Sequence, residues 1–283
     1  MIGHPHREAV MVHDQDTLLT RVPSRDGTEI GYFSTGTGPP LLLVHGSLGD
    51  HTRWDALRPH LEPHFTVHAM DRRGRGASGD SPDYRIEREY EDVAAVIDSI
   101  AESAGTPVDV YCSSYGGLCT FGATSMTSNI RRLALYEAWP AIDPQQMAES
   151  PEQLKQLDDL LAKGDREAAL VFAYRKVLGM SDDQLELLRS QPAWPARLAA
   201  AHTIPREARA FGQVAFDPNQ ANKITVPTLL LIGTESPVWG PQASEVAAAL
   251  PDARIAVLEG QGHVADLMAP ELVAGALLPF LLE

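Results

Sequence analysis

The stretch Val110-Tyr111-Cys112-Ser113-Ser114-Tyr115-Gly116-Gly117 decides the fold, because small residues in it join an apolar run to a segment that can be helical. A serine at such a strand-to-helix turn is a nucleophile elbow, and the positions two before and two after the nucleophile must be small. The usual pattern is G-x-S-x-G, and Cys112 replaces its first glycine here. We predict Ser114 as the nucleophile, because the corresponding neighbours of Ser113 are both bulky tyrosines. A plain loop of serine and glycine is the alternative interpretation.

Short apolar runs and helical patterns alternate on both sides of this turn. The apolar runs predict strands over residues 18–22, 29–33, 41–44, 66–70, 107–111, 133–137, 228–232 and 254–258. Helical patterns lie between them, over residues 54–61, 86–104, 242–250 and 270–282. This order predicts an α/β fold whose mostly parallel sheet has helices on both faces and site residues beyond the carboxyl ends of its strands. Residues 1–16 are polar, and we expect a loose arm there.

One long segment differs from the rest. Residues 138–222 are rich in Ala, Leu, Gln and Glu and contain no convincing strand. They predict a helical insertion, with helices near 151–162, 166–178 and 182–189. We therefore expect a core domain of residues 1–137 and 223–283 and a helical cap of residues 138–222.

Composition and charge restrict the function. The chain has 283 residues, a net charge of −15 and a pI near 5.0, so its field repels nucleic acids and anionic lipids. Its two cysteines indicate a reducing compartment, and residues 1–8 lack the apolar core of a signal peptide. The apolar residues 272–282 are too few to cross a bilayer. We expect a cytoplasmic protein without nucleic-acid or membrane partners, and homo-oligomerisation stays open.

Four motifs together resemble the α/β-hydrolase superfamily over nearly all of residues 17–283. They are Leu43-Val44-His45-Gly46, Asp71-Arg72-Arg73-Gly74-Arg75-Gly76-Ala77-Ser78, Ser113-Ser114-Tyr115-Gly116-Gly117 and Gly260-Gln261-Gly262-His263. The resemblance implies an eight-stranded α/β-hydrolase fold and the chain order nucleophile, acid, histidine. Ser114 is then the nucleophile and His263 its general base. The resemblance also implies an oxyanion hole made by the backbone N–H groups of Ser47 and Tyr115.

The acid of this triad departs from the family pattern. Ser236 stands where an aspartate commonly stands, after the strand predicted at 228–232. Glu235 is adjacent, and Glu137 ends the preceding strand. Zearalenone lactonases look similar in placing a glutamate at the Glu137 site. Both strand ends should lie beside the histidine loop, so either carboxylate could reach the imidazole. We favour Glu137, with Glu235 as the second choice, because Glu235 is one residue away from the usual position and its side chain should point elsewhere.

Several other residues have structural interpretations that we prefer. The segment 74–79 matches G-x-G-x-x-G, but a turn follows it where a dinucleotide site needs a helix. Asp71 is predicted to be a turn residue, and Asp266 to cap the last helix. His45 is predicted to brace the oxyanion loop.

Three histidines are spaced by four, as helical metal ligands can be. They are His60, His64 and His68, but Pro63 intervenes and His68 falls in a predicted strand. We predict surface histidines, and we expect neither a metal nor a cofactor.

The predicted function is that of a serine hydrolase. It cleaves a carboxylic ester or lactone of a medium-sized, mostly apolar small molecule through an acyl-enzyme. We expect Leu48, Trp139 and Val264 to contact the substrate. Phe172, Tyr174 and Trp194 either line the pocket or pack the cap helices, and packing is favoured. The resemblance disfavours epoxide hydrolases and haloalkane dehalogenases, which carry an aspartate at the elbow. A lyase on the same fold and a hydrolase-like binding protein are the alternatives.

Overall fold

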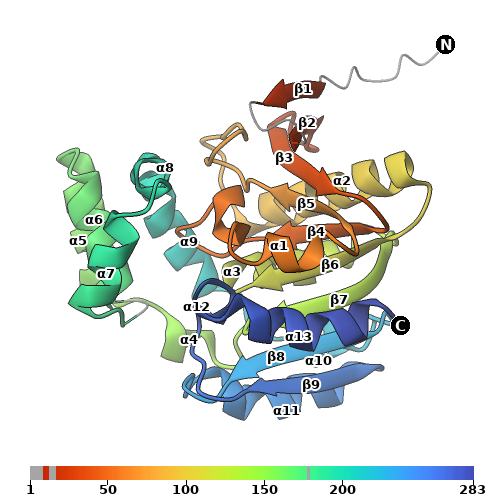
Figure 1. The fold of residues 1–283 in the computed structure, drawn as a ribbon. Coiled ribbons are helices and arrows are strands. Elements are labelled where there is room, and N and C mark those ends of the chain that lie inside the picture. Colours follow the sequence, from red (N-terminus) through yellow and green to blue (C-terminus); the bar gives the residue numbers. More distant parts are fainter. Residues whose placement is uncertain (1–8, 13–16, 177–178) are drawn as a thin grey trace.

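A computed structural model describes residues 9–12, 17–176 and 179–283, and its strands form one nine-stranded sheet (Figure 1). The spatial order is β1-β2-β3-β5-β4-β6-β7-β8-β9. The strands are β1 (Ala9–Val12), β2 (Thr17–Pro23), β3 (Glu29–Gly36), β4 (Pro40–Val44), β5 (Thr66–Met70), β6 (Val108–Ser113), β7 (Ile130–Tyr136), β8 (Thr228–Gly233) and β9 (Ala253–Leu258). The pairs from β5 to β9 are parallel, and those involving β1, β2 and β3 are antiparallel. The predicted α/β fold with a mostly parallel sheet is therefore confirmed.

The ninth strand corrects the expectation of a loose arm. All the predicted strands are present, and β1 adds to them by pairing antiparallel with β2. The expectation was wrong for residues 9–12. A short strand at the edge of a sheet needs little alternation of apolar and polar residues, so the sequence pattern did not mark it. Residues 1–8 and 13–16 lie outside the described residues.

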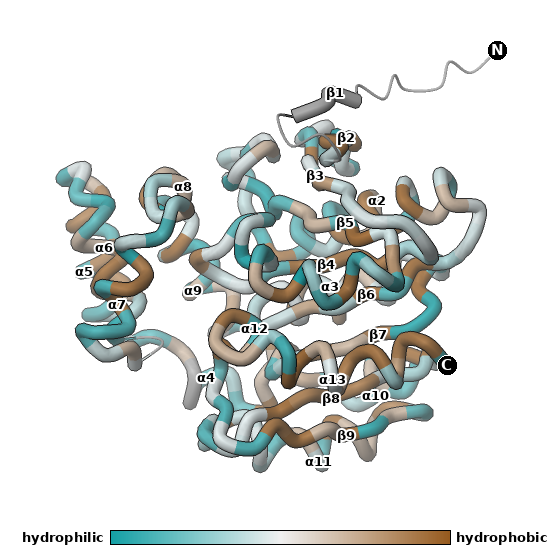
Figure 2. Tube along the Cα trace, in the orientation of Figure 1, coloured by the Kyte–Doolittle hydropathy of each residue, from teal (hydrophilic) through white to brown (hydrophobic). Residues whose placement is uncertain are grey.

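Apolar side chains of the central strands face both ways, because successive residues of a strand point to opposite faces. In β4, Leu42 and Val44 join a core with α2 (Ile86–Ala104), α3 (Tyr115–Ala123) and α11 (Trp239–Ala249). Leu41 and Leu43 join a second core with the helices of the other face. These are η1 (His51–Trp54), α1 (Arg58–Leu61), α12 (Ala265–Met268) and α13 (Pro270–Leu281). In Figure 2, β8 and α13 are mostly brown, as expected for buried elements.

One predicted helix is divided in the structure. Residues 54–61 were expected to form a single helix, but η1 ends at Trp54 and α1 begins at Arg58. Pro59 near the start of α1 lacks the N–H that a continuous helix would use, so the chain makes two short turns.

The segment between β7 and β8 is helical, as predicted. It contains α4 (Pro144–Met147), α5 (Pro151–Ala162), α6 (Arg166–Lys176), α7 (Asp182–Arg189), α8 (Trp194–Ala199), η2 (Ala200–Thr203), α9 (Ile204–Phe211) and α10 (Pro218–Ala221). Ser150 and Ser181 begin α5 and α7 with capping boxes. The helices α5 to α8 stand to one side of the sheet in Figure 1 and share a third core with Leu48. The predicted last residues of α6, 177 and 178, lie outside the described residues.

No helix in the described part of the chain is both long and apolar enough to cross a membrane.

Candidate active site

Ser114 lies in a tight turn between β6 and α3. Its backbone has φ 52° and ψ −129°, a conformation that non-glycine residues rarely adopt. The glycines after it are required by space, because a Cβ on Gly116 would lie 2.4 Å from the Val44 carbonyl oxygen. Cys112, two residues before Ser114, is fully buried and its thiol lies 3.5 Å from the carbonyl oxygen of Ala134. A small side chain therefore suffices where the usual pattern has glycine.

A chain of hydrogen bonds connects three of the predicted residues. The Ser114 Oγ lies 2.9 Å from the Nε2 of His263. The Nδ1 of the same ring lies 2.6 Å from a carboxylate oxygen of Glu137. When Nδ1–H donates to Glu137, Nε2 is left as an acceptor for the serine hydroxyl. This arrangement can activate an alcohol as a nucleophile.

Glu137 reaches the histidine from the end of β7. Its side chain is fully buried, its φ is +46°, and its second carboxylate oxygen accepts the Gly233 N–H at 2.9 Å. Because β7 and β8 pair in parallel, their carboxyl ends lie side by side, next to the loop that carries His263. Glu235 is exposed, and its N–H donates to the Gln261 carbonyl at 2.8 Å. The structure thus brings the first-choice acid to the imidazole and leaves the second choice at the surface.

Ser236 occupies the turn where the family commonly has an aspartate. Its side chain is buried, it lines the pocket, and its hydroxyl has no hydrogen-bond partner among the described residues. The contact to His263 that an acid would make here comes from Glu137 instead.

The loop after β4 is braced from behind by His45. Its Nδ1 lies 2.7 Å from the Gly46 carbonyl oxygen, and its Nε2 accepts the backbone N–H of Arg72 at 3.2 Å. Burial and the nearby charges of Arg72 and Arg75 hold the pKa of His45 well below its usual value. A neutral ring with one donor and one acceptor fits both bonds.

The N–H of Tyr115 is the first of helix α3 and so has no partner within the helix. Ser47 and Tyr115, the two predicted oxyanion donors, line the same pocket as Ser114.

A pocket of about 510 Å³ opens in front of Ser114 and His263. Residues from both the core and the helical segment line it, and they include Leu48 and Val264, two of the three residues expected to contact the substrate. Trp139 does not line it and corrects its prediction, since it is buried and packs edge-on against Trp239 with ring centroids 5.3 Å apart. Burial in the core between β7 and α11 leaves Trp139 behind the pocket wall.

Trp239 is the pocket aromatic that sequence reasoning missed. It stacks parallel to His263 at 5.7 Å between ring centroids and lines the pocket. It lies three residues before the predicted helix over 242–250, which was placed too late, since α11 begins at Trp239. Phe172, Tyr174 and Trp194 pack in the core of the helical segment, as favoured.

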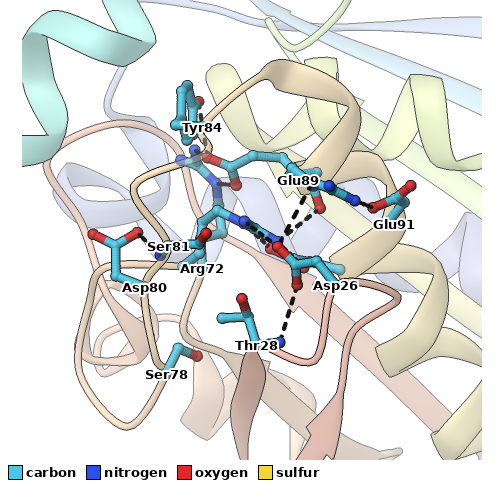
Figure 3. Close-up of polar contacts among 12 residues, drawn as sticks. Asp26, Thr28, Arg72, Ser78, Asp80, Ser81, Tyr84, Glu89 and Glu91 are labelled. Atoms are coloured by element: carbon cyan, nitrogen blue, oxygen red, sulfur yellow. Dashed lines mark hydrogen bonds and ion pairs between the residues drawn. The ribbon is translucent and has the colours of Figure 1, made fainter.

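Buried ion pairs connect this helical segment to the loop after β5. Arg72 pairs with Glu89 of α2 and with Glu207 of α9, and Figure 3 shows Arg72, Glu89 and Tyr84 in this cluster. Glu207 also pairs with Arg75 and lines the pocket. Sequence reasoning missed Glu207, because nothing local to α9 marks a residue whose partners lie more than a hundred positions earlier.

Other predicted features of this region are confirmed or corrected. Asp71 is a turn residue, as predicted, and accepts the backbone N–H groups of His51 and Ala77, both at 2.7 Å. The segment 74–79 opens no helix, and α2 begins only at Ile86. Asp266 was wrongly predicted to cap the last helix. It lies in the first turn of α12, where it pairs with Arg53.

The three histidines at a spacing of four share no face. His60 and His64 are exposed, whereas His68 lies in β5, with its Nδ1 2.8 Å from the Ser34 hydroxyl. His68 is half-buried, which lowers its pKa to about 4, so the prediction of surface histidines fits His68 only in part. Within residues 9–12, 17–176 and 179–283, no group of three or more potential ligand side chains could hold a metal ion.

Known proteins resemble the chain over most of its length. The profile of the Alpha/beta hydrolase family matches residues 41–276. An alpha/beta hydrolase from Sphaerobacter thermophilus is 37% identical, with a TM-score of 0.78 over 92% of this chain and 99% of that one. A pimeloyl-[acyl-carrier protein] methyl ester esterase from Stenotrophomonas maltophilia is 27% identical over 252 residues, 87% of this chain and 94% of the relative. A haloalkane dehalogenase from Mesorhizobium japonicum is 25% identical over 81% of this chain and 80% of its own length.

Proposed function

The chain belongs to the alpha/beta hydrolase family, and on that premise we propose that it is a serine hydrolase that cleaves a carboxylic ester or lactone through an acyl-enzyme. The observation that supports this is the chain of hydrogen bonds from Ser114 through His263 to Glu137, which faces a pocket of about 510 Å³. A pocket of this volume fits a medium-sized organic molecule.

The proposed reaction follows from these contacts. The imidazole of His263 takes the proton of the Ser114 hydroxyl while the oxygen attacks the carbonyl carbon. Glu137 stabilises the imidazolium that forms, and the N–H groups of Ser47 and Tyr115 hold the oxyanion. His263 then protonates the leaving alcohol, and a water molecule activated by the same ring hydrolyses the acyl-enzyme.

The helical segment of residues 138–222 is proposed to act as a cap that contacts the substrate. Ala173, Met180 and Phe211 come from this segment and line the pocket together with core residues. Their apolar side chains favour an apolar acyl or alcohol group.

The substrate is proposed to be uncharged. Glu149, Glu207 and Glu235 line the pocket, and no lysine or arginine does so among the residues that the structure describes. Glu207 is already paired with Arg72 and Arg75. An anionic substrate would still meet the carboxylates of Glu149 and Glu235 without a lysine or arginine in the described lining to pair with, at a cost that rises where water is excluded.

Dehalogenation is not favoured, despite the haloalkane dehalogenase among the relatives. Attack of a serine oxygen on an alkyl halide would leave an ether, which this machinery cannot hydrolyse. An acyl-enzyme ester can be hydrolysed, so the nucleophile favours acyl transfer.

One experiment tests the function. The protein is incubated with p-nitrophenyl esters, with a panel of lactones and with a fluorophosphonate, and the intact mass is then measured. We expect ester or lactone turnover and one phosphonyl group on Ser114, with both lost in Ser114→Ala. Turnover that survives Ser114→Ala would contradict the assignment. Labelling without any turnover would instead favour a lyase or a binding protein.

A second comparison tests the charge preference. p-Nitrophenyl hexanoate and the mono-p-nitrophenyl ester of adipic acid have similar length, but only the second carries a carboxylate. We expect kcat/KM to be at least about tenfold higher for the neutral ester, which corresponds to about 1.4 kcal/mol. Equal values at low ionic strength would contradict an acidic pocket.

A further inference from the structure

The peptide group between Gly46 and Ser47 is held firmly at its carbonyl end. The Gly46 oxygen accepts hydrogen bonds from the Nδ1 of His45 at 2.7 Å and from the Nη1 of Arg72 at 3.2 Å. A peptide group is planar, with its C=O and N–H pointing in opposite directions. Fixing the Gly46 carbonyl therefore fixes the direction of the Ser47 N–H, which is a proposed oxyanion donor.

Arg72 is itself held in one position by ion pairs. It is fully buried, and its Nε and Nη2 donate to the two carboxylate oxygens of Glu89 at 2.9 and 2.7 Å (Figure 3). Its Nη2 also donates to Glu207 at 2.7 Å. The guanidinium carbon lies 4.6 Å from the centre of the Tyr115 ring, so Arg72 contacts both the peptide group that carries the Ser47 N–H and the side chain of Tyr115.

Glu207 connects the helical segment to Arg72 and Arg75. It lies on α9, it is buried, and it pairs with both Arg72 and Arg75. Burial alone would raise the pKa of Glu207, but the charges of Arg72 and Arg75 outweigh it and hold the pKa at about 2. The carboxylate is therefore ionised at neutral pH, and it balances one of the two buried guanidinium charges.

We propose that Glu207 and Arg72 are positioning residues through which the docked α9 helix orients the Ser47 N–H for the oxyanion. This proposal rests on the proposed function, because it assigns the Gly46–Ser47 peptide a role in stabilising the transition state. Without the charge of Glu207, Arg72 keeps its two bonds to Glu89 but loses its second carboxylate partner, so its bond to the Gly46 carbonyl is held less firmly. The transition state should lose stabilisation while the bound ester, which carries no oxyanion, should not.

The chain offers a matched control. Arg206, next to Glu207 on α9, pairs with Asp80 at 2.8 Å and so joins the same helix to the same loop. Asp80 has no contact with the Gly46–Ser47 peptide among its hydrogen bonds in the described residues. Asp80→Asn thus weakens the attachment of α9 without touching the proposed oxyanion donor.

The test compares Glu207→Gln with Asp80→Asn and the wild type on a neutral p-nitrophenyl ester. We expect Glu207→Gln to lower kcat about tenfold or more, less than the roughly 10² to 10³ lost when an oxyanion donor is removed outright. KM should change less than about twofold, as expected when only a transition-state interaction is lost. Asp80→Asn should keep kcat close to that of the wild type.

A second readout isolates the oxyanion. The Ser114 oxygen adds to the carbonyl carbon of a trifluoromethyl ketone of matching shape while the serine proton passes to His263, and the former carbonyl oxygen then carries the negative charge. Its affinity should fall in Glu207→Gln by the same factor as kcat/KM. If Glu207→Gln does not fold, Glu207→Asp keeps the charge at a shorter reach. It should then lower kcat and ketone affinity together with KM unchanged.

Three results would overturn the proposal. They are an unchanged kcat in the folded Glu207 variant, equal losses in Glu207→Gln and Asp80→Asn, and a rise in KM alone. A wild type without Ser114-dependent turnover would instead overturn the proposed function, and the positioning role would fall with it.

Discussion

Glu137 reaches His263 because its backbone adopts a conformation that is unusual for its residue type. Its φ of +46° turns the side chain back from the end of β7, as the φ of +52° at Ser114 exposes the hydroxyl at the end of β6. Such conformations cost about 1 to 3 kcal/mol each and persist only where the surroundings enforce them. Here the backbone N–H of Glu137 bonds to Leu231 and the side chain bonds to Gly233.

The role of this carboxylate can be tested by a single atom exchange. Glu137→Gln removes the negative charge and offers the ring an amide that can present N–H, so the imidazole no longer holds the required tautomer. We expect kcat to fall on the order of 10⁴-fold, as it does for the matching aspartate in serine proteases. Stopped-flow or steady-state assays of a p-nitrophenyl ester would measure it.

Glu235→Gln is the matched comparison, since the side chain is exposed at the rim of the pocket. It should change kcat by no more than a few-fold. Equal and mild losses in both variants would contradict the assignment of the acid to Glu137.

Residues with a local signature could be predicted from the sequence, and the others could not. Ser114 and His263 lie in motifs beside strands, and Glu137 lies at a strand end, so their meeting place followed from the parallel sheet. Trp239 and Glu207 have no such signature. Their positions depend on how α11 and α9 pack, which is decided by contacts distant in sequence.

Among the elements, α3 makes an unusually close contact with the chain after β7. α3 packs so close to the start of the helical segment that a Cβ on Gly117 would lie 2.0 Å from the Ala138 oxygen and 2.3 Å from its Cβ. Both obstacles belong to backbone or Cβ atoms that cannot rotate away. The elbow helix and the segment after Glu137 can therefore pack this closely only because Gly117 has no side chain.

Gly117→Ala should consequently destabilise the fold. We expect the free energy of unfolding to fall by about 1 to 3 kcal/mol, the usual cost of an overpacked core, or more if the backbone cannot shift. Urea unfolding followed by circular dichroism would measure it.

Gly275→Ala in α13 provides the comparison, because nothing lies within 4 Å of the added Cβ. It should stabilise the helix by about 0.5 to 1 kcal/mol. A Gly117→Ala protein as stable as the wild type would show that α3 is free to move away from Ala138.

Most elements followed from periodicity, and the errors have local causes. Long apolar runs such as β4 and β8 are buried on both faces, so sequence alone marks them. β1 has only four residues, and Pro59 divides the helix expected over 54–61.

At the scale of the whole molecule, the half-buried imidazole of His68 limits the pH range of stability. His68 has a pKa of about 4 in the folded protein, against an ordinary value of 6.5. Because the folded pKa is the lower one, the unfolded chain binds a proton first as the pH falls. This contribution to stability is full above pH 6.5 and is lost between pH 6.5 and 4.

The expected loss can be measured. At pH 4.5 the His68 contribution should be lower than at pH 7 by about 2 to 3 kcal/mol. His68→Asn should therefore show a smaller drop in the free energy of unfolding between these pH values than the wild type does. His64→Asn, at an exposed position, should follow the wild type, and a His68→Asn curve parallel to it would contradict the argument.

The turn after β8 need not supply a carboxylate to His263, because Glu137 at the end of the neighbouring strand makes that contact. Glu235, Ser236, Pro237 and Val238 line the pocket, yet the imidazole takes its partner from elsewhere. Randomising these four side chains in a directed-evolution library should change which esters are accepted. The hydrogen bonds from Ser114 through His263 to Glu137 should remain.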